Sequence, residues 1–246
     1  SIIKVLLPLI PILDMFVLAH NGSGYHIYND TGGTSTCGGA IPALTIWLWE
    51  EQLVLQFVNK GTFTMNKGTV MNAQTGVQNY AGAKFTFAGG TIKKCTTRGV
   101  TNSGTFNMTA GTISNNKSDY GAGITTDGTV NISGGTITAN TASADGGAIH
   151  INGNNAVVNI SGGTISNNKA ANSGGGIMNW NGTLTLTGGT ISGNTALNGK
   201  GIYSNDILRM SGNGSVNTNN DIYLTTNHYV TVTGALNKTS GQVALL

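Results

Sequence analysis

A short phrase of the type Gly-Gly-Thr-Ile recurs through most of this chain at a nearly regular interval. Its apolar residue falls at Val70, Ile92, Ile113, Ile137, Ile165 and Ile191, so successive copies lie 22, 21, 24, 28 and 26 residues apart. A self-similar period in this range is typical of solenoids, in which one repeat cannot bury its apolar face and stacked neighbours build a shared core. The repeat therefore constrains the architecture more than any other feature of the sequence.

Two further apolar segments run in phase with this phrase. The first ends, copy by copy, at Val77, Val100, Ile124, Ile149, Ile177 and Ile202. The second alternates apolar and polar residues, with apolar pairs at Phe106 and Met108, Val130 and Ile132, Val158 and Ile160, and Leu184 and Leu186. Gly, Asn and Ser clusters separate these segments and are typical of turns. We predict an all-β fold, a right-handed single-stranded parallel β-helix with three short strands per coil of 21–28 residues.

Asparagines occupy a recurrent turn position, three residues after an apolar ladder residue. They are Asn116, Asn140, Asn168, Asn194 and Asn219. Asparagine tolerates left-handed backbone conformations, and stacked amides can donate to and accept from their neighbours. We therefore expect these residues to form a structural asparagine ladder along the axis.

The sequence divides into four parts. Residues 1–19 have the layout of a secretory signal peptide, with Lys4 before an apolar stretch and small residues up to Ala19. An irregular N-terminal segment or cap follows over 20–58, then the β-helix repeats over 59–224 and a C-terminal strand or cap over 225–246. This organisation predicts a secreted or cell-surface protein.

Residues 41–58 do not follow the repeat and hold two of the three tryptophans. One interpretation is a capping helix that begins near Pro42 and covers the open end of the solenoid. The other is a reading-frame error, because back-translation of Trp49 to Val54 in a shifted frame yields Gly-Gly-Thr-Ile-Gly. The underlying DNA sequence would distinguish these interpretations.

Composition argues against several classes of partner. Charged residues make up 9% of the chain and the net charge is +3 without a basic cluster, so we expect no nucleic-acid partner. The two cysteines, Cys37 and Cys95, lie more than one coil apart, which favours two free thiols over a disulfide or a metal site. We expect no cofactor.

The motifs resemble those of a known class of surface proteins. Gly38-Gly39-Ala40-Ile41 and Gly146-Gly147-Ala148-Ile149 match the Gly-Gly-Ala-Ile motif of chlamydial polymorphic membrane proteins, a family of autotransported adhesins. That family pairs this motif with Phe-x-x-Asn, whereas this chain has Ile-x-x-Asn, as in Ile113 to Asn116. The chain is more similar to bacterial surface proteins with Gly-Gly-Thr-Ile-Ser-x-Asn repeats and a pectin-lyase-like β-helix, over residues 59–222.

This resemblance implies an exported bacterial adhesin or structural stalk that is not an enzyme. Its partner would be a host, matrix or glycan ligand that the sequence does not identify. We expect a monomer, with any membrane anchor outside this fragment.

Two other functions remain open at this point. Pectin-lyase-like folds include polysaccharide lyases and hydrolases, and the best acidic pair for such chemistry is Asp119 and Asp145, which lie in comparable loops of adjacent coils. A lesser alternative is ice binding by a file of outward threonines. That file, which is also a possible surface-binding ladder, consists of Thr91, Thr112, Thr136, Thr164 and Thr190.

Overall fold

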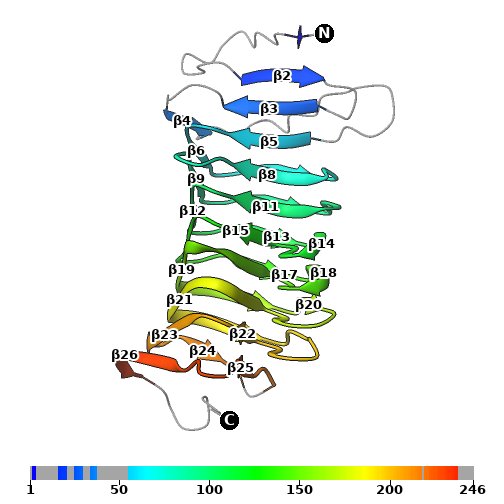
Figure 1. The fold of residues 1–246 in the computed structure, drawn as a ribbon. Coiled ribbons are helices and arrows are strands. Elements are labelled where there is room, and N and C mark those ends of the chain that lie inside the picture. Colours follow the sequence, from blue (N-terminus) through cyan, green and yellow to red (C-terminus); the bar gives the residue numbers. More distant parts are fainter. Residues whose placement is uncertain are drawn as a thin grey trace.

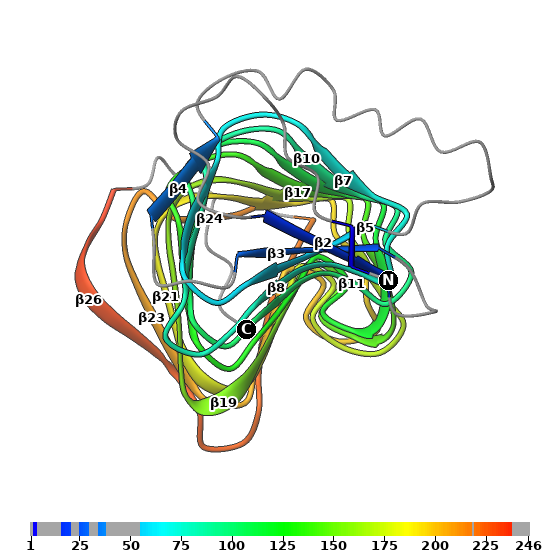
Figure 2. The same cartoon turned by 90° about the horizontal axis from the view of Figure 1, so that it is seen from above.

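The fold is a stack of β-coils along a single axis. The structure, a computed structural model, describes residues 2–3, 16–20, 25–29, 34–37, 55–217 and 219–237, and before residue 56 it describes only the backbone. All regular elements in these ranges are strands, and successive coils pair through parallel strands (Figure 1). The view along the axis shows that the coils superpose on one another (Figure 2). The predicted all-β solenoid with about three strands per coil is therefore confirmed.

Three ladders of parallel strands form the sides of the stack, which we call faces A, B and C. Face A contains β7 (Thr69–Met71), β10 (Thr91–Lys93), β13 (Thr112–Ser114), β17 (Thr136–Thr138), the last residues of β19 (Ile149–Ser166) and β21 (Ile177–Ser192), and β24 (Ser215–Val216). Face B contains β3 (Tyr25–Asn29), β5 (Leu55–Asn59), β8 (Thr75–Asn79), β11 (Arg98–Asn102), β15 (Ile124–Thr126), the first residues of β19 and β21, β22 (Ile202–Ser204) and β25 (Ile222–Leu224). Face C contains β4 (Thr34–Cys37), β6 (Thr62–Met65), β9 (Lys84–Phe87), β12 (Thr105–Met108), β16 (Thr129–Ile132), the middle of β19 and β21, β23 (Ile207–Gly212) and β26 (Val230–Leu236).

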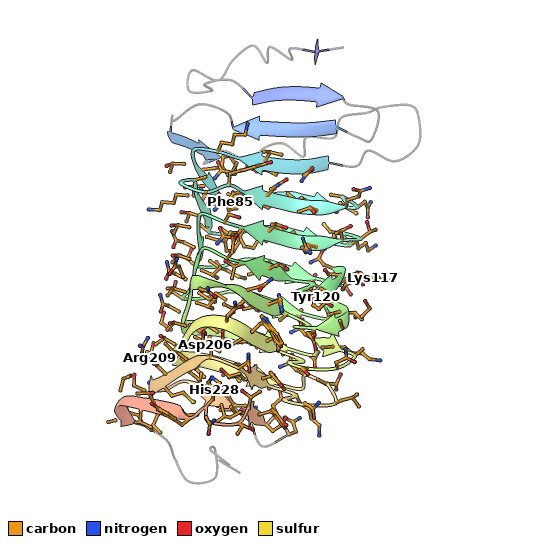
Figure 3. The ribbon with its side chains drawn as sticks, in the orientation of Figure 1. Phe85, Lys117, Tyr120, Asp206, Arg209 and His228 are labelled. Atoms are coloured by element: carbon orange, nitrogen blue, oxygen red, sulfur yellow. The ribbon has the colours of Figure 1, made fainter. Side chains whose placement is uncertain are left out.

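Each face contributes rows of inward side chains to one continuous core. On face A the register pairs Val70, Ile92, Ile113, Ile137, Ile165 and Ile191 with one another, coil after coil. Face C adds larger side chains, and Phe85 and Phe106 stack with ring centroids 5.6 Å apart (Figure 3). Alternation along a strand turns every second side chain inward, so identical positions of successive coils meet in the interior. Burial of each large apolar side chain contributes about 1.5–3 kcal/mol to folding.

An inner row of asparagines follows face A at the corner toward face B. Asn116, Asn140, Asn168 and Asn194 are buried, and each donates its side-chain amide to the Oδ1 atom of the next asparagine along the axis, at 2.9–3.0 Å. The last acceptor is Asn220. The sequence analysis placed Asn219 in this position, and that assignment is wrong. The turn after Val216 is one residue longer than in the other coils, so Asn219 is exposed and Asn220 is buried in the row.

A second asparagine row, which sequence analysis missed, lies at the corner between faces B and C. Asn59 donates to Asn79 and Asn79 donates to Asn102, each at 2.7 Å. The row continues with Thr126, is interrupted by the apolar Ile151, and resumes with Asn179. Each member follows an inward ladder residue by two positions, which is the signal that could have identified it.

Glycines allow the coils to approach closely at the corner before face A. Gly135 has a φ of 84°, a left-handed conformation that favours glycine. Its neighbour Gly134 is needed for a different reason, because a Cβ atom there would lie 2.2 Å from the carbonyl oxygen of Thr109 in the preceding coil. In the Gly-Gly pair, the second glycine thus provides the left-handed backbone, and the first leaves room for the backbone of the preceding coil.

The stack extends further toward the N-terminus than the repeat does. β5 pairs in parallel with β8 and with β3, and β4 pairs in parallel with β6. β3 in turn pairs antiparallel with β2 (Phe16–His20), which pairs antiparallel with β1 (Ile2–Ile3). We expected an irregular segment over 20–58, but the described residues of that range form strands that continue the ladders of faces B and C. The strand Leu55–Asn59 replaces the end of the expected capping helix, and residues 41–54 lie outside the described residues. Most of the expected signal peptide also lies outside them.

Candidate functional site

A side lobe projects from the corner between faces A and B in the later coils only. It is a separate three-stranded parallel sheet of β14 (Lys117–Tyr120), β18 (Thr141–Asp145) and β20 (Lys169–Ala170). Figure 2 shows the lobe as a hook that curls back toward the side bearing β8 and β11. Val100 follows Cys95 by five positions, whereas Ile124 follows Asn116 by eight and Ile149 follows Asn140 by nine. The extra residues of the longer coils form the lobe.

The lobe buries little apolar surface of its own. Its small core consists of Ala122, Ala142 and Ala170, with Ala196 packed against them. A buried methyl group contributes about 0.8 kcal/mol, whereas ordering one residue costs about 1–2 kcal/mol in backbone entropy. Burial of apolar surface alone therefore does not explain why the lobe is folded. The main structural consequence of the lobe is that it changes the shape of the surface of face B.

The lobe returns onto face B over His150. A Cβ atom on Gly121 would lie 2.8 Å from the Cβ atom of His150, and one on Gly146 would lie 3.0 Å from it. The hydroxyl of Thr125 donates to the carbonyl oxygens of Tyr120 and Gly121, which ties the return segment to the face. Sequence alternation places His150 outward, yet only 6% of it is exposed because the lobe covers it. We call this region, where the first lobe strand meets face B, the corner site.

Arg98, Tyr120 and His150 lie on three successive coils around the corner site, and the backbone hydrogen bond from Gly99 to Ala122 places the coil of Arg98 beside that of Tyr120. The ring centroids of Tyr120 and His150 are 5.4 Å apart, and Tyr120 is 45% exposed at the edge of the lobe (Figure 3). Burial, followed by the positive charge of Arg98, lowers the pKa of His150 from 6.5 to about 4. His150 is therefore neutral at pH 7.

Two polar atoms at the corner site lack hydrogen-bond partners. They are the Nε atom of Arg98 and the Nδ1 atom of His150, and both are buried. Buried polar groups in proteins are nearly always paired, so an unpaired group requires an explanation. The corner site therefore holds two buried nitrogen atoms without hydrogen-bond partners.

The acidic pair singled out from the sequence has structural contacts. The register of β14 and β18 places Asp145 beside Tyr120, not beside Asp119. The Oδ1 atom of Asp145 accepts a hydrogen bond from the backbone N–H of Ser173, 2.9 Å away, and Asp119 accepts one from the hydroxyl of Ser143. Each carboxylate therefore connects its own coil to the next one, and these hydrogen bonds favour a structural role for both.

The outward threonines of face A lie in a continuous file. The register joins Thr69 to Thr91 and then joins Thr112, Thr136, Thr164 and Thr190 in succession. The file two residues further along each strand is less uniform, because it begins with Met71 and Lys93 before the Ser and Thr positions. All six threonines are partly exposed or exposed.

Sequence reasoning missed the corner site. It singled out neither Arg98 nor Tyr120. The available signal was the spacing between the two inward ladders, which is 8 positions from Ile92 to Val100, 11 or 12 in the next four coils, and 6 from Val216 to Ile222. That change marks the first lobe strand, but not the direction in which the lobe folds.

Searches against protein-family models, curated proteins and solved structures found no match for this chain. Among residues with described side chains, no three His, Cys, Asp or Glu residues cluster as metal ligands would. In the same part of the chain no helix is long and apolar enough to cross a bilayer.

Proposed function

We propose that this chain is an exported bacterial surface protein that binds an extended partner through face B and the side lobe, without catalysing a reaction. The observation that carries this proposal is the lobe itself. It is present only in some coils, contributes little to the core, and holds Tyr120 exposed beside an otherwise continuous face. Surface segments that a rigid scaffold positions in this way commonly carry binding function. The repeat motifs and the N-terminal sequence support export to the cell surface.

Binding arrays test this proposal. The full chain is applied to glycans and extracellular-matrix proteins, and Tyr120→Ser is compared with Tyr229→Ser. Tyr229 is a matched control because it is 74% exposed and lies near the other end of the described stack. We expect the Tyr120 variant alone to lose binding to a ligand that the unmodified chain captures. Equal effects of both variants, or capture of no ligand, would contradict the proposal.

An assay for turnover tests the non-catalytic part. Acidic polysaccharides are incubated with the chain and followed for new reducing ends and unsaturated products. Turnover that disappears in Asp119→Asn or Asp145→Asn would replace the adhesin proposal with a lyase or hydrolase.

Ice binding is a second candidate, favoured by the in-register threonine file of face A. A flat strand face of this kind presents methyl and hydroxyl groups at a regular repeat of about 4.8 Å along the axis. The test is inhibition of ice recrystallisation by the chain, with Thr136→Lys on face A and Thr129→Lys on face C as a matched pair. Inhibition lost only in the Thr136 variant would establish this candidate, and its absence in the unmodified chain would refute it.

A further inference from the structure

The corner site lies at a step in the molecule. β14 is the first strand of the lobe, and the preceding coil runs directly from Cys95 to Val100 without a lobe segment. Arg98 belongs to that preceding coil, so it lies just beyond the free edge of β14. Tyr120 ends β14, and Figure 3 shows it with Lys117 on the lobe. Among the described coils the lobe begins at this position and ends before the last coil, where Val216 and Ile222 are six positions apart, so Arg98 is the outward residue of face B at the start of the lobe.

Arg98 has no partner for its charge. No ion pair or side-chain hydrogen bond joins it to another residue that the structure describes, and its Nε atom is buried and unpaired. Its electrostatic neighbour is His150, whose Nδ1 atom is also buried and unpaired and which has only 6% of its surface exposed. A buried or half-buried guanidinium normally pairs with a carboxylate or phosphate, because desolvation is otherwise uncompensated.

Tyr120 presents an exposed aromatic ring beside Arg98 and His150, against which the uncharged part of a ligand could pack. Its backbone carbonyl oxygen already accepts hydrogen bonds from the hydroxyls of Ser118 and Thr125, and its backbone N–H donates to Ser118. The backbone at the edge of the lobe is therefore satisfied, while the ring remains 45% exposed next to His150. An exposed aromatic ring beside an unpaired cation suits a ligand with an apolar or ring-shaped body and one negative group.

We propose that the corner site binds a carboxylate-bearing ligand, with Arg98 pairing the carboxylate and Tyr120 packing against the body of the ligand. This inference rests on the proposed function and specifies the chemistry of its partner. The planar guanidinium of Arg98 matches a carboxylate in a two-point geometry. A single negative charge on the ligand balances the charge of Arg98, while His150 is neutral. The carboxylate comes from an acidic sugar or from an acidic peptide side chain.

Calorimetry on the full chain tests the site with four probes. Glucuronate represents an acidic sugar, N-acetylglutamate an acidic peptide, acetate the carboxylate alone, and glucose the neutral sugar. We expect glucuronate or N-acetylglutamate to bind and glucose not to bind, with acetate weaker because it lacks a body for Tyr120 to contact. Whichever of the two larger acids binds more tightly identifies the source of the carboxylate.

Matched arginine variants locate the site. Arg98→Gln is expected to weaken binding of the acid about tenfold or more, because it removes a charge-assisted hydrogen bond. Arg98→Lys should weaken binding less, because it retains the positive charge. Arg209→Gln is the control, since Arg209 is an outward, half-buried arginine of face C (Figure 3). Unchanged thermal unfolding would establish that each variant is folded. Equal loss in both glutamine variants, or no loss in Arg98→Gln, would overturn the proposal.

The pKa of the His150 imidazole gives an independent readout of binding. It would not respond to the acid if Arg98 had only a structural role. NMR titration follows its pKa with and without the acid that binds. A bound carboxylate beside His150 favours the protonated ring, so we expect its pKa to rise from about 4. The charged and titratable groups around it are Arg98 on β11, Tyr120 on β14 and Asp145, which ends β18 beside Tyr120. An unchanged pKa at saturating acid would contradict binding at this site.

The two proposals fail separately. If the arrays capture a neutral ligand in a Tyr120-dependent manner while none of the acids binds, the proposed function holds and the carboxylate inference is wrong. If the arrays capture no ligand and the acids do not bind, both are wrong.

Discussion

Asn168 uses nearly the full hydrogen-bonding capacity of a buried amide. The two N–H groups of its Nδ2 atom are shared among three acceptors, the carbonyl oxygens of Ile137 and Ser166 and Oδ1 of Asn194, while its own Oδ1 accepts from Asn140. An inner asparagine therefore connects three successive coils where the chain turns. Removal of such a side chain leaves several buried groups unpaired at once.

We predict that Asn168→Ala lowers the free energy of unfolding by about 3 kcal/mol or more. Asn159→Ala is the control, because Asn159 belongs to a half-buried outward row on face C and donates only to Asn131. Asn159→Ala should lower the free energy of unfolding by less than about 1 kcal/mol. Urea unfolding measures both values, and similar losses would show that the inner row has no special role.

The pH dependence of stability should report His150. Because its pKa is lowered from 6.5 to about 4 on folding, the unfolded chain binds more protons between these values. The contribution of His150 to stability is therefore fully present above pH 6.5 and falls, by about 3 kcal/mol, as the pH drops toward 4. Urea unfolding at several pH values should show this slope. His150→Leu should reduce it, whereas replacement of the exposed His228 should not.

Ala139 has an unfavourable backbone conformation. Its φ is 55°, whereas asparagines occupy the corresponding positions of the adjacent coils, at Asn115 and Asn167. We predict that Ala139→Gly stabilises the protein by about 1 kcal/mol, because glycine adopts this conformation without steric cost. Ala142→Gly, at a buried strand position, should instead destabilise it. Thermal unfolding of the two variants checks both signs.

At the scale of the elements, the turn before each face A strand determines how closely two coils approach. A Cβ atom on Gly134 would lie 2.2 Å from Thr109 O, and backbone cannot move away without breaking the ladder. We predict that Gly134→Ala lowers the free energy of unfolding by about 2–3 kcal/mol. Gly234→Ala should be nearly neutral, since its nearest contact would be 3.4 Å from a side chain. Comparable unfolding midpoints for the two variants would contradict this account.

Sequence alternation predicted the strand elements well, but not the lobe. The inward rows of faces A and B could be read directly, since each coil repeats an apolar residue at the same position. The lobe strands lack that signal because their core is made of small alanines. The turn near Val216 likewise differs by one residue, which is why Asn220 and not Asn219 joins the inner row.

At the scale of the whole molecule, each coil contacts only its neighbours, so stability should vary along the axis. Among the strands that the structure describes, β26 pairs with β23 alone, and most of its residues are exposed, whereas β16 pairs on both sides and has buried side chains. We predict that amides of Val230–Leu236 exchange about 100-fold faster than those of Thr129–Ile132. Hydrogen exchange followed by mass spectrometry measures this ratio, and uniform protection would indicate a single cooperative unit.

The repeat period and the alternation within it determined the parallel stack, its three faces and the identity of most core residues. These properties are local, because an apolar residue at every second position turns inward wherever its strand lies. The corner site was decided only by tertiary structure. Arg98, Tyr120 and His150 come from three successive coils, and Tyr120 reaches the ring of His150 because the lobe folds back on face B. That direction depends on contacts between residues far apart in the chain, which no local pattern records.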